Sequence, residues 1–98
     1  MELKMLTGQL ELILVGDLVG YDAHLWYHLH RLESLHPEKL IVDASKARIN
    51  PEGVEFWVKM VRSTLHGVPI EYKPSQLAHV LKYDDSYEPA HTIFLGED

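Results

Sequence analysis

Two histidines in this sequence have a spacing that can bind a metal ion. His24 and His28 are four residues apart, which on a helix places both imidazole rings on one face. A catalytic zinc ion needs a third protein ligand and an open coordination position. The intervening residues, Leu-Trp-Tyr, lack the glutamate of an HExxH motif. Because the chain has seven histidines among 98 residues, such a pair is expected by chance. We therefore predict no metal site and no cofactor.

Two aspartates are candidates for acid–base catalysis. Asp17 and Asp43 each follow an apolar run that predicts a strand, and aspartate commonly ends such runs. Neither has a nucleophile and a base beside it in the sequence, and no glycine-rich phosphate loop is present. The sequence therefore predicts a protein that is not an enzyme. A small metal-binding enzyme using the two histidines is the least favoured alternative.

Composition limits the class of protein further. A length of 98 residues predicts a single domain over 1–98. The 15 acidic and 9 basic residues give a net charge of −6, which argues against binding nucleic acid or an anionic membrane. The absence of cysteine excludes disulfides, thiolate catalysis and cysteine-type zinc sites. No apolar run is long enough to span a bilayer, and the N-terminus does not read as a secretion signal. We therefore expect a cytoplasmic protein with no membrane insertion.

The most informative stretch runs from residue 40 to residue 66. Its first residues, Leu-Ile-Val at 40–42, predict a buried strand that ends at Asp43. Asn50 is typical of a helix N-cap, with Pro51 at the first helical position and Glu52 at the positive end of the helix dipole. Apolar residues then recur at helical spacing as far as His66. The loop over 43–53 is thus expected where a central strand ends, an edge at which α/β proteins usually meet their partners.

The remaining patterns complete an α/β architecture. They predict strands at 2–6, 10–15, 68–72 and 92–95 and helices at 23–35 and 76–82, with a hairpin closed by residues 16–18. An opening hairpin followed by strand–helix alternation implies a mixed sheet. Right-handed crossovers would gather the helices on one face, so that the other face stays wet or binds something. The buried side chains are expected to include Leu25, Leu29, Leu32, either Leu35 or His36, Trp57, Leu77, Val80 and Leu81.

Four features in this order resemble the STAS family, which includes the bacterial anti-sigma factor antagonists. Gly16-Asp17-Leu18 is similar to the family's G-[DE]-L element, and the predicted helix at 23–35 follows it. The run LIVDAS at 40–45 is similar to its "vvlDls" strand. The run INPEGV at 49–54 is similar to [IV]-D-S-[ST]-G-[LIV], and a helix, a glycine and a short strand come next. The resemblance covers about residues 10–80 and implies a STAS-like mixed sheet.

The chain departs from the family at the phosphorylation motif. Asn50 stands at the aspartate position, Pro51 at the usual phosphoacceptor position and Glu52 where a second Ser or Thr is common, while Gly53 is kept. Proline has no hydroxyl group, so phosphorylation cannot occur at that position. The family's C-terminal helix is also missing from the pattern. Glu52 is open to two interpretations: a fixed substitute for a phosphate, or a glutamate that stabilises the start of the helix.

The resemblance implies a non-catalytic regulatory domain that binds another protein. The expected partner is an anti-sigma-type kinase. In the alternative reading, the chain is a small cytoplasmic subunit of a bacterial ABC lipid-transport system and its partner is the ATPase subunit. An uncovered strand at 92–95 would also permit a homodimer. Ser45 is either a shifted phosphorylation site or part of a polar loop. The predicted partner-binding residues are Ser45, Arg48, Asn50, Pro51, Glu52, Gly53 and Phe56, the last as an exposed contact.

Overall fold

The computed structural model describes residues 2–6, 9–20, 22–65, 67–84, 87 and 92–96. Five strands and three helices are assigned within these residues. In chain order they are β1 (Glu2–Leu6), β2 (Gln9–Leu18), α1 (Ala23–Leu35), β3 (Lys39–Ile49), α2 (Pro51–Thr64), β4 (Ile70–Tyr72), α3 (Gln76–Lys82) and β5 (Thr92–Phe94).

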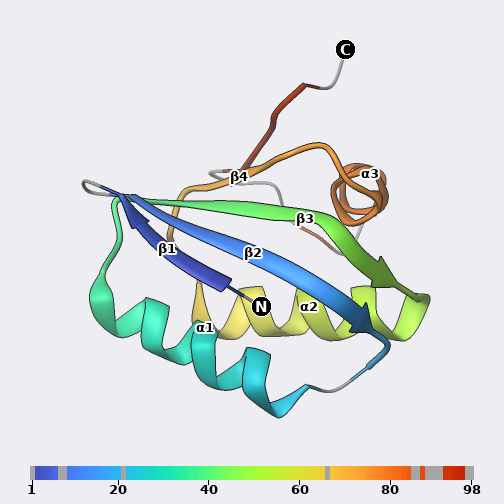
Figure 1. Ribbon diagram of the computed structural model, residues 1–98, viewed down its shortest axis with the longest axis horizontal. Coiled ribbons are helices and arrows are strands. Elements are labelled where there is room, and N and C mark those ends of the chain that lie inside the picture. Colours follow the sequence, from blue (N-terminus) through green and yellow to red (C-terminus); the bar gives the residue numbers. More distant parts are fainter. Residues whose placement is uncertain are drawn as a thin grey trace.

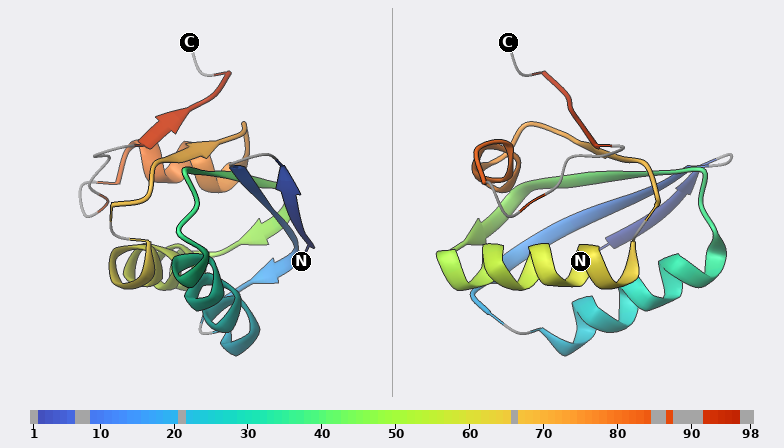
Figure 2. Two further views of the ribbon diagram at one scale, coloured as in Figure 1. Left: turned by 90° about the vertical axis from the view of Figure 1, so that its left-hand side faces the viewer. Right: turned by 180° about the vertical axis from the view of Figure 1, so that it is seen from behind.

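The strands form one mixed sheet in the order β1-β2-β3-β4-β5. β1 and β2 are an antiparallel hairpin, and every later pair is parallel. α1 and α2 lie along one face of this sheet, and α3 lies beside the end of β3 (Figures 1 and 2). The predicted fold class is therefore confirmed: an opening hairpin, strand–helix alternation and helices mainly on one face, an order compatible with a STAS-like sheet.

The core lies between the sheet and the helices. Alternate residues of the central strands point to opposite faces, so Leu12 of β2 and Val42 of β3 are fully buried under the helices. Leu29 of α1 and Trp57 of α2 face the sheet from the helical layer, and both are also fully buried. Leu25, Leu29, Leu32, Trp57, Leu77 and Leu81 are buried as predicted. Val80 and either Leu35 or His36 were predicted to be buried, but all three are exposed, Leu35 by 48% and Val80 by 37%, and Ala78 takes the buried position of α3.

A chain of buried hydroxyl groups links the core to the last strand. The indole N–H of Trp57 donates to the Tyr72 hydroxyl at 3.0 Å. That hydroxyl lies 2.7 Å from the hydroxyl of Tyr87, which in turn lies 3.1 Å from Oγ1 of Thr92. Each of these polar atoms thus has a partner inside the protein, which removes the cost of burying it.

The predicted helix starts are all confirmed by their capping bonds. The Asp22 carboxylate accepts from the backbone N–H groups of residues 24 and 25. The Asn50 side-chain oxygen accepts from the Gly53 N–H at 2.8 Å, and the Ser75 hydroxyl accepts from the Ala78 N–H at 3.1 Å. These bonds satisfy amides that have no partner within their own helix. α2 ends at Thr64, earlier than expected, and His66 lies outside the described residues.

The two central strands are longer than the sequence predicts. β3 continues past Asp43 to Ile49, and residues 16–18 belong to β2 instead of closing a hairpin. The cause is pairing between the strands, which resumes after a shift in register: Ile13 lies opposite Asp43 and Val15 opposite Lys46. β3 therefore holds one more residue than β2 across this shift, as in a β-bulge. Conversely, β4 starts at Ile70 and β5 ends at Phe94, each inside its predicted range.

Candidate functional site

The start of α2 is seated on the end of β2. The backbone N–H of Asn50 donates to the Leu18 carbonyl at 3.3 Å, so the strand fixes where the helix begins. A β-carbon at Gly53 would collide with that same Leu18 backbone, which is why only glycine fits there. The element at 16–18 and the run at 49–54, which carry the family resemblance, therefore pack directly against each other.

The side chain of Asn50 organises this junction. Its oxygen caps α2, and its Nδ2 group donates to Oε2 of Glu52 at 2.9 Å. The same nitrogen lies 3.5 Å from the carbonyl oxygen of Val19. Pro51 and Glu52 are both exposed on top of this capped turn. The position that the resemblance aligns with a phosphoacceptor is thus an outward-facing proline on a fixed backbone.

A hollow of about 360 Å³ opens beside this turn, between α2 and α3. Ile49, Val54 and Val80 give it an apolar lining. Tyr83, one turn further along the chain from Val80, is 69% exposed. The hollow includes two carboxylates and no basic side chain, and its complete lining is Ile49, Asn50, Pro51, Val54, Glu55, Gln76, Val80 and Asp84. It can accept an apolar side chain from a partner. One of its carboxylates, that of Glu55, already pairs with Lys59 at 3.4 Å.

The structure brings some of the predicted partner-binding residues together and separates others. Asn50 and Pro51 line the hollow, and Glu52 and Gly53 continue the same turn. Phe56 was predicted to be an exposed contact, but it is half-buried and packs against the core. The loop predicted over 43–53 is wrong, because only Asn50 connects β3 to α2.

Ser45 and Arg48 were predicted in that loop and instead lie in β3. Both are exposed, and the register places Arg48 opposite Asp17 of β2. Sequence reasoning missed the contribution of α3 to the hollow, since Val80 and Asp84 carry no local signal that α2 is their neighbour. The Leu18 carbonyl was missed for the same reason.

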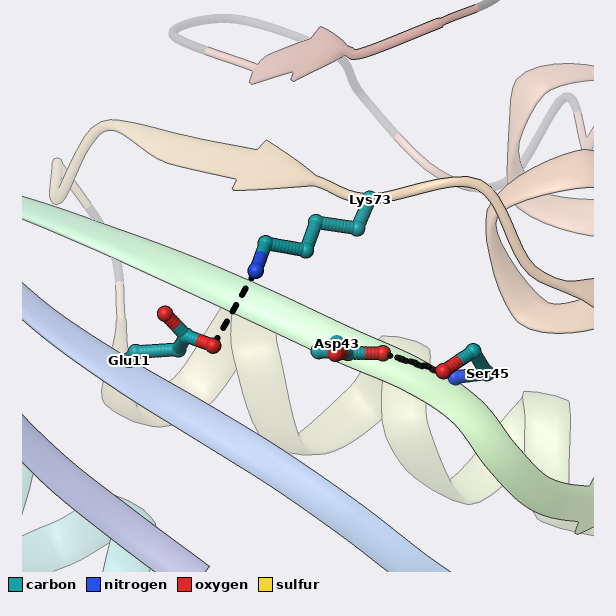
Figure 3. A network of polar contacts seen from close by, with 4 residues as sticks. All are labelled: Glu11, Asp43, Ser45 and Lys73. Carbon is teal, nitrogen blue, oxygen red and sulfur yellow. Dashed lines mark hydrogen bonds and ion pairs between the residues drawn. The ribbon is translucent and has the colours of Figure 1, made fainter.

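The helix-free face of the sheet carries a second group of polar contacts (Figure 3). Lys73 reaches across β3 to pair with Glu11 of β2 at 3.1 Å, and Lys39 pairs with Glu71 at 3.1 Å. At the bulge, Asp43 accepts from both the hydroxyl and the N–H of Ser45, at 2.7 and 3.0 Å. Lys73 with Glu11 and Lys39 with Glu71 therefore neutralise one another, whereas the Asp43 carboxylate is held by hydrogen bonds from Ser45.

The hydrogen bonds around Asp43 favour its ionised form, which does not suit proton exchange near neutral pH. The hydrogen bond from the Ser45 hydroxyl, followed by the one from the Ser45 N–H, holds the pKa of Asp43 below its ordinary value of 3.8. Asp17 lies four residues along β2 from the partner of Asp43, which is about 13 Å at the usual rise per residue. The structure therefore does not bring the two aspartates together.

His24 and His28 lie on α1 near its start. In the part of the chain that the structure describes, no group of three or more histidine, cysteine, aspartate or glutamate side chains is placed to hold a metal ion. No helix within the described ranges is long and apolar enough to cross a membrane. No protein-family model matches the chain, and no curated protein matches it.

Proposed function

We propose that this protein is a non-catalytic, STAS-like protein-interaction domain that regulates its partner by docking. The docking surface is the start of α2 together with the hollow between α2 and α3. One observation carries the proposal: exposed Pro51 and Glu52 stand on a backbone held by Asn50 and Leu18, directly beside an apolar hollow. A prearranged surface of this kind binds without the entropic cost of ordering a loop.

The docking surface has no phosphorylated and unphosphorylated forms to switch between. Pro51 has no hydroxyl group to modify, and Asn50 holds the Glu52 carboxylate over the helix start. Binding is therefore constitutive and does not switch by phosphorylation at this turn. Glu52 supplies one negative charge where a phosphoserine would supply about 1.5 to 2, so it is a weak substitute for a phosphate. It also favours the helix through the dipole, and the two roles are compatible.

The partner is expected to place an apolar side chain in the hollow and a basic residue near Glu52, whose carboxylate is exposed beside it. An anti-sigma-type kinase in the cytoplasm is the partner that the family resemblance implies. The exposed carboxylate and the net charge of −6 support a basic partner surface, because opposite charge speeds encounter and fixes orientation.

Site-specific photocrosslinking in the source cells tests this proposal. A benzophenone amino acid replaces Tyr83, the exposed aromatic residue beside the hollow, in one protein and Glu33, an exposed residue at the far end of α1, in a control protein. Both substitutions leave Glu52 in place. We expect a crosslink to a kinase-fold protein from position 83 alone. An equal yield from both positions, or no crosslink from position 83 under conditions where the protein is folded, would contradict the docking surface.

The alternative function, a cytoplasmic subunit of an ABC lipid-transport system, is supported by a different observation. Tyr27 and Leu35 of α1 are 61% and 48% exposed on the helical side of the molecule. An obligate subunit is expected to cover such side chains with its partner. The same benzophenone at position 27 would then crosslink to an ATPase subunit, whereas a kinase partner predicts that position 27 stays unlinked.

A further inference from the structure

Within the described residues, the end of β2 has one edge with no strand beside it. β1 pairs with β2 only as far as Ile13, which lies opposite Glu2, so residues 14–18 extend beyond the hairpin. Figure 1 shows β2 running past β1 toward the start of α1. β3 pairs with one side of this segment, and among the described residues no strand pairs with the other. An open edge presents backbone N–H and C=O groups that can pair with another chain.

A hollow of about 360 Å³ follows this free edge. All five residues 14–18 line the hollow, so it follows the end of β2. The backbone is irregular here, since the register shifts after Ile13 and Gly16 has a φ of 95°. Two small residues leave the space: Gly16 has no side chain, and Ala47 lies opposite it. A β-carbon at Gly16 would meet no atom within 4 Å. The start of α1 closes the far side.

The groove has buried leucines beneath it and both apolar and polar side chains along it. Leu14 and Leu25 are buried beneath it, and Val15 is 53% exposed beside it. Asp17 is exposed, and the register places it opposite Arg48 of β3. No lysine or arginine lines it; the complete set is Leu14, Val15, Gly16, Asp17, Leu18, Asp22, His24, Leu25, His28 and Ala47. A second copy of this chain would bring another net charge of −6, so a basic segment fits better than self-pairing.

We propose that this groove binds an extended segment of a partner protein as an added strand next to β2. The segment spans about five residues, or about 17 Å at the rise of a strand. A large apolar side chain enters the hollow below Gly16, and a neighbouring Lys or Arg points to the other face and meets Asp17. Backbone hydrogen bonds provide affinity and the alternating side chains provide specificity. This site shares no lining residue with the hollow between α2 and α3, so it stands independently of the proposed function.

The experiment is a nuclear magnetic resonance titration of the isotope-labelled full chain with three capped peptides. The first is basic, Thr-Lys-Leu-Lys-Thr; the second is acidic, Thr-Glu-Leu-Glu-Thr; the third is the basic peptide methylated on every backbone nitrogen. We expect the basic peptide to shift the amide signals of residues 14–18 and of His24 and His28. The acidic and methylated peptides should leave them in place, since one has the wrong charge and the other has no backbone donors.

Two charge variants make the result specific. Asp17→Lys should weaken binding of the basic peptide by about fivefold, the size of an exposed charge pair. Glu33→Lys makes the same change of charge at an exposed position on α1 and should leave binding unaltered. Asp17→Asn, a milder change, should give a smaller loss and guards against misfolding of the first variant.

Four outcomes would overturn the proposal. The first is that the basic peptide shifts signals elsewhere or nowhere, and the second is that the methylated peptide binds as tightly as its parent. The third is equal weakening of binding by the two lysine variants, which would show that net charge alone accounts for the effect. The fourth is a shift of the signals of residues 14–18 with protein concentration alone, which would assign the groove to a second copy of the chain.

Discussion

The backbone carbonyl group of Leu18 lies so close to Gly53 that a β-carbon at residue 53 would collide with it. The same carbonyl accepts the Asn50 N–H, so the last residue of β2 both anchors and limits the start of α2. The fold thereby couples the end of one strand to the surface that we propose for docking.

Gly53→Ala should destabilise the protein by about 1–3 kcal/mol, because the added methyl group forces backbone apart in a packed site. Without the collision, alanine would stabilise the helix by about 1 kcal/mol relative to glycine. A loss of stability therefore supports the close packing, and a gain does not. Urea unfolding followed by circular dichroism measures it. Glu55→Ala, at an exposed position two residues along α2, is the control and should change stability by less than about 0.5 kcal/mol. A gain in stability for Gly53→Ala would refute the close packing.

Ser45→Ala should raise the pKa of Asp43 toward its ordinary value of 3.8, because it removes the hydroxyl that donates to the carboxylate. A carboxyl whose pKa is lowered by folding contributes stability above its unfolded pKa, and that contribution is lost as the pH falls through the lower folded value. The parent protein should therefore lose stability as the pH falls from the ordinary value of 3.8 to the lower folded value, and the variant should lose less over the same range, because its folded and unfolded pKa values lie closer together. Carbon-detected resonance titration of Asp43 is the measurement.

Ser63→Ala is the matched control for that titration. The Ser63 hydroxyl donates to the backbone carbonyl of Lys59 on α2 and touches no carboxylate. An unchanged Asp43 titration in Ser45→Ala, or an equal change in Ser63→Ala, would show that Ser45 does not set the pKa.

The protein should lose stability as the pH rises above about 10, the ordinary tyrosine value. Burial raises the pKa of Tyr72 well above that value, with the neighbouring Tyr87 as a smaller cause, and burial also raises the pKa of Tyr87. A raised folded pKa gives stability that is complete below the unfolded pKa and is lost as the pH climbs through the interval up to the folded value. Urea unfolding at about pH 8 and at about pH 10.5 measures the slope.

Tyr72→Phe separates two effects in that series. At neutral pH it should cost about 1–3 kcal/mol, because the Trp57 N–H loses its acceptor in the core. Between about pH 8 and about pH 10.5, the Tyr72→Phe variant should nevertheless lose less unfolding free energy than the parent protein does. Tyr83→Phe, at an exposed position, should match the parent at both pH values. A parent curve that stays flat above the ordinary tyrosine pKa would be evidence against the buried hydroxyl chain.

Glu52→Lys should abolish binding of the partner with little loss of thermal stability. The side chain is exposed, and its structural role is confined to the bond from Asn50 and a dipole contribution of about 0.3–1 kcal/mol. Pull-down of the partner identified by crosslinking, together with the melting temperature, gives the two readouts. If stability falls and binding survives, Glu52 only stabilises the helix start.

Local signals predicted the helices well because each start is decided by one side chain. Asp22, Asn50 and Ser75 bond to amides two or three residues away, so neighbouring sequence contains all the information. The ends of β2 and β3 were missed because distant pairing decides them: a strand that looks finished at Asp43 continues since β2 lies beside it.

The candidate site was predicted only in part for a similar reason. Asn50 and Pro51 are typical of a helix start, and the order of the elements places this start at the end of a strand. The hollow also needs Val80 of α3, and no pattern in the sequence reports which helix faces α2. Phe56 was misplaced because it flanks the apolar stripe of α2 and still packs against the core.

The burial of Trp57 gives the molecule a built-in optical reporter. Its indole is fully enclosed and donates to Tyr72, whereas Trp26 of α1 is half-buried with its ring set edge-on against His30. An aqueous quencher such as iodide will therefore reach the emission of Trp26 and not that of Trp57. Two single-tryptophan forms of the chain would report separately on the collapse of the core and on events along α1.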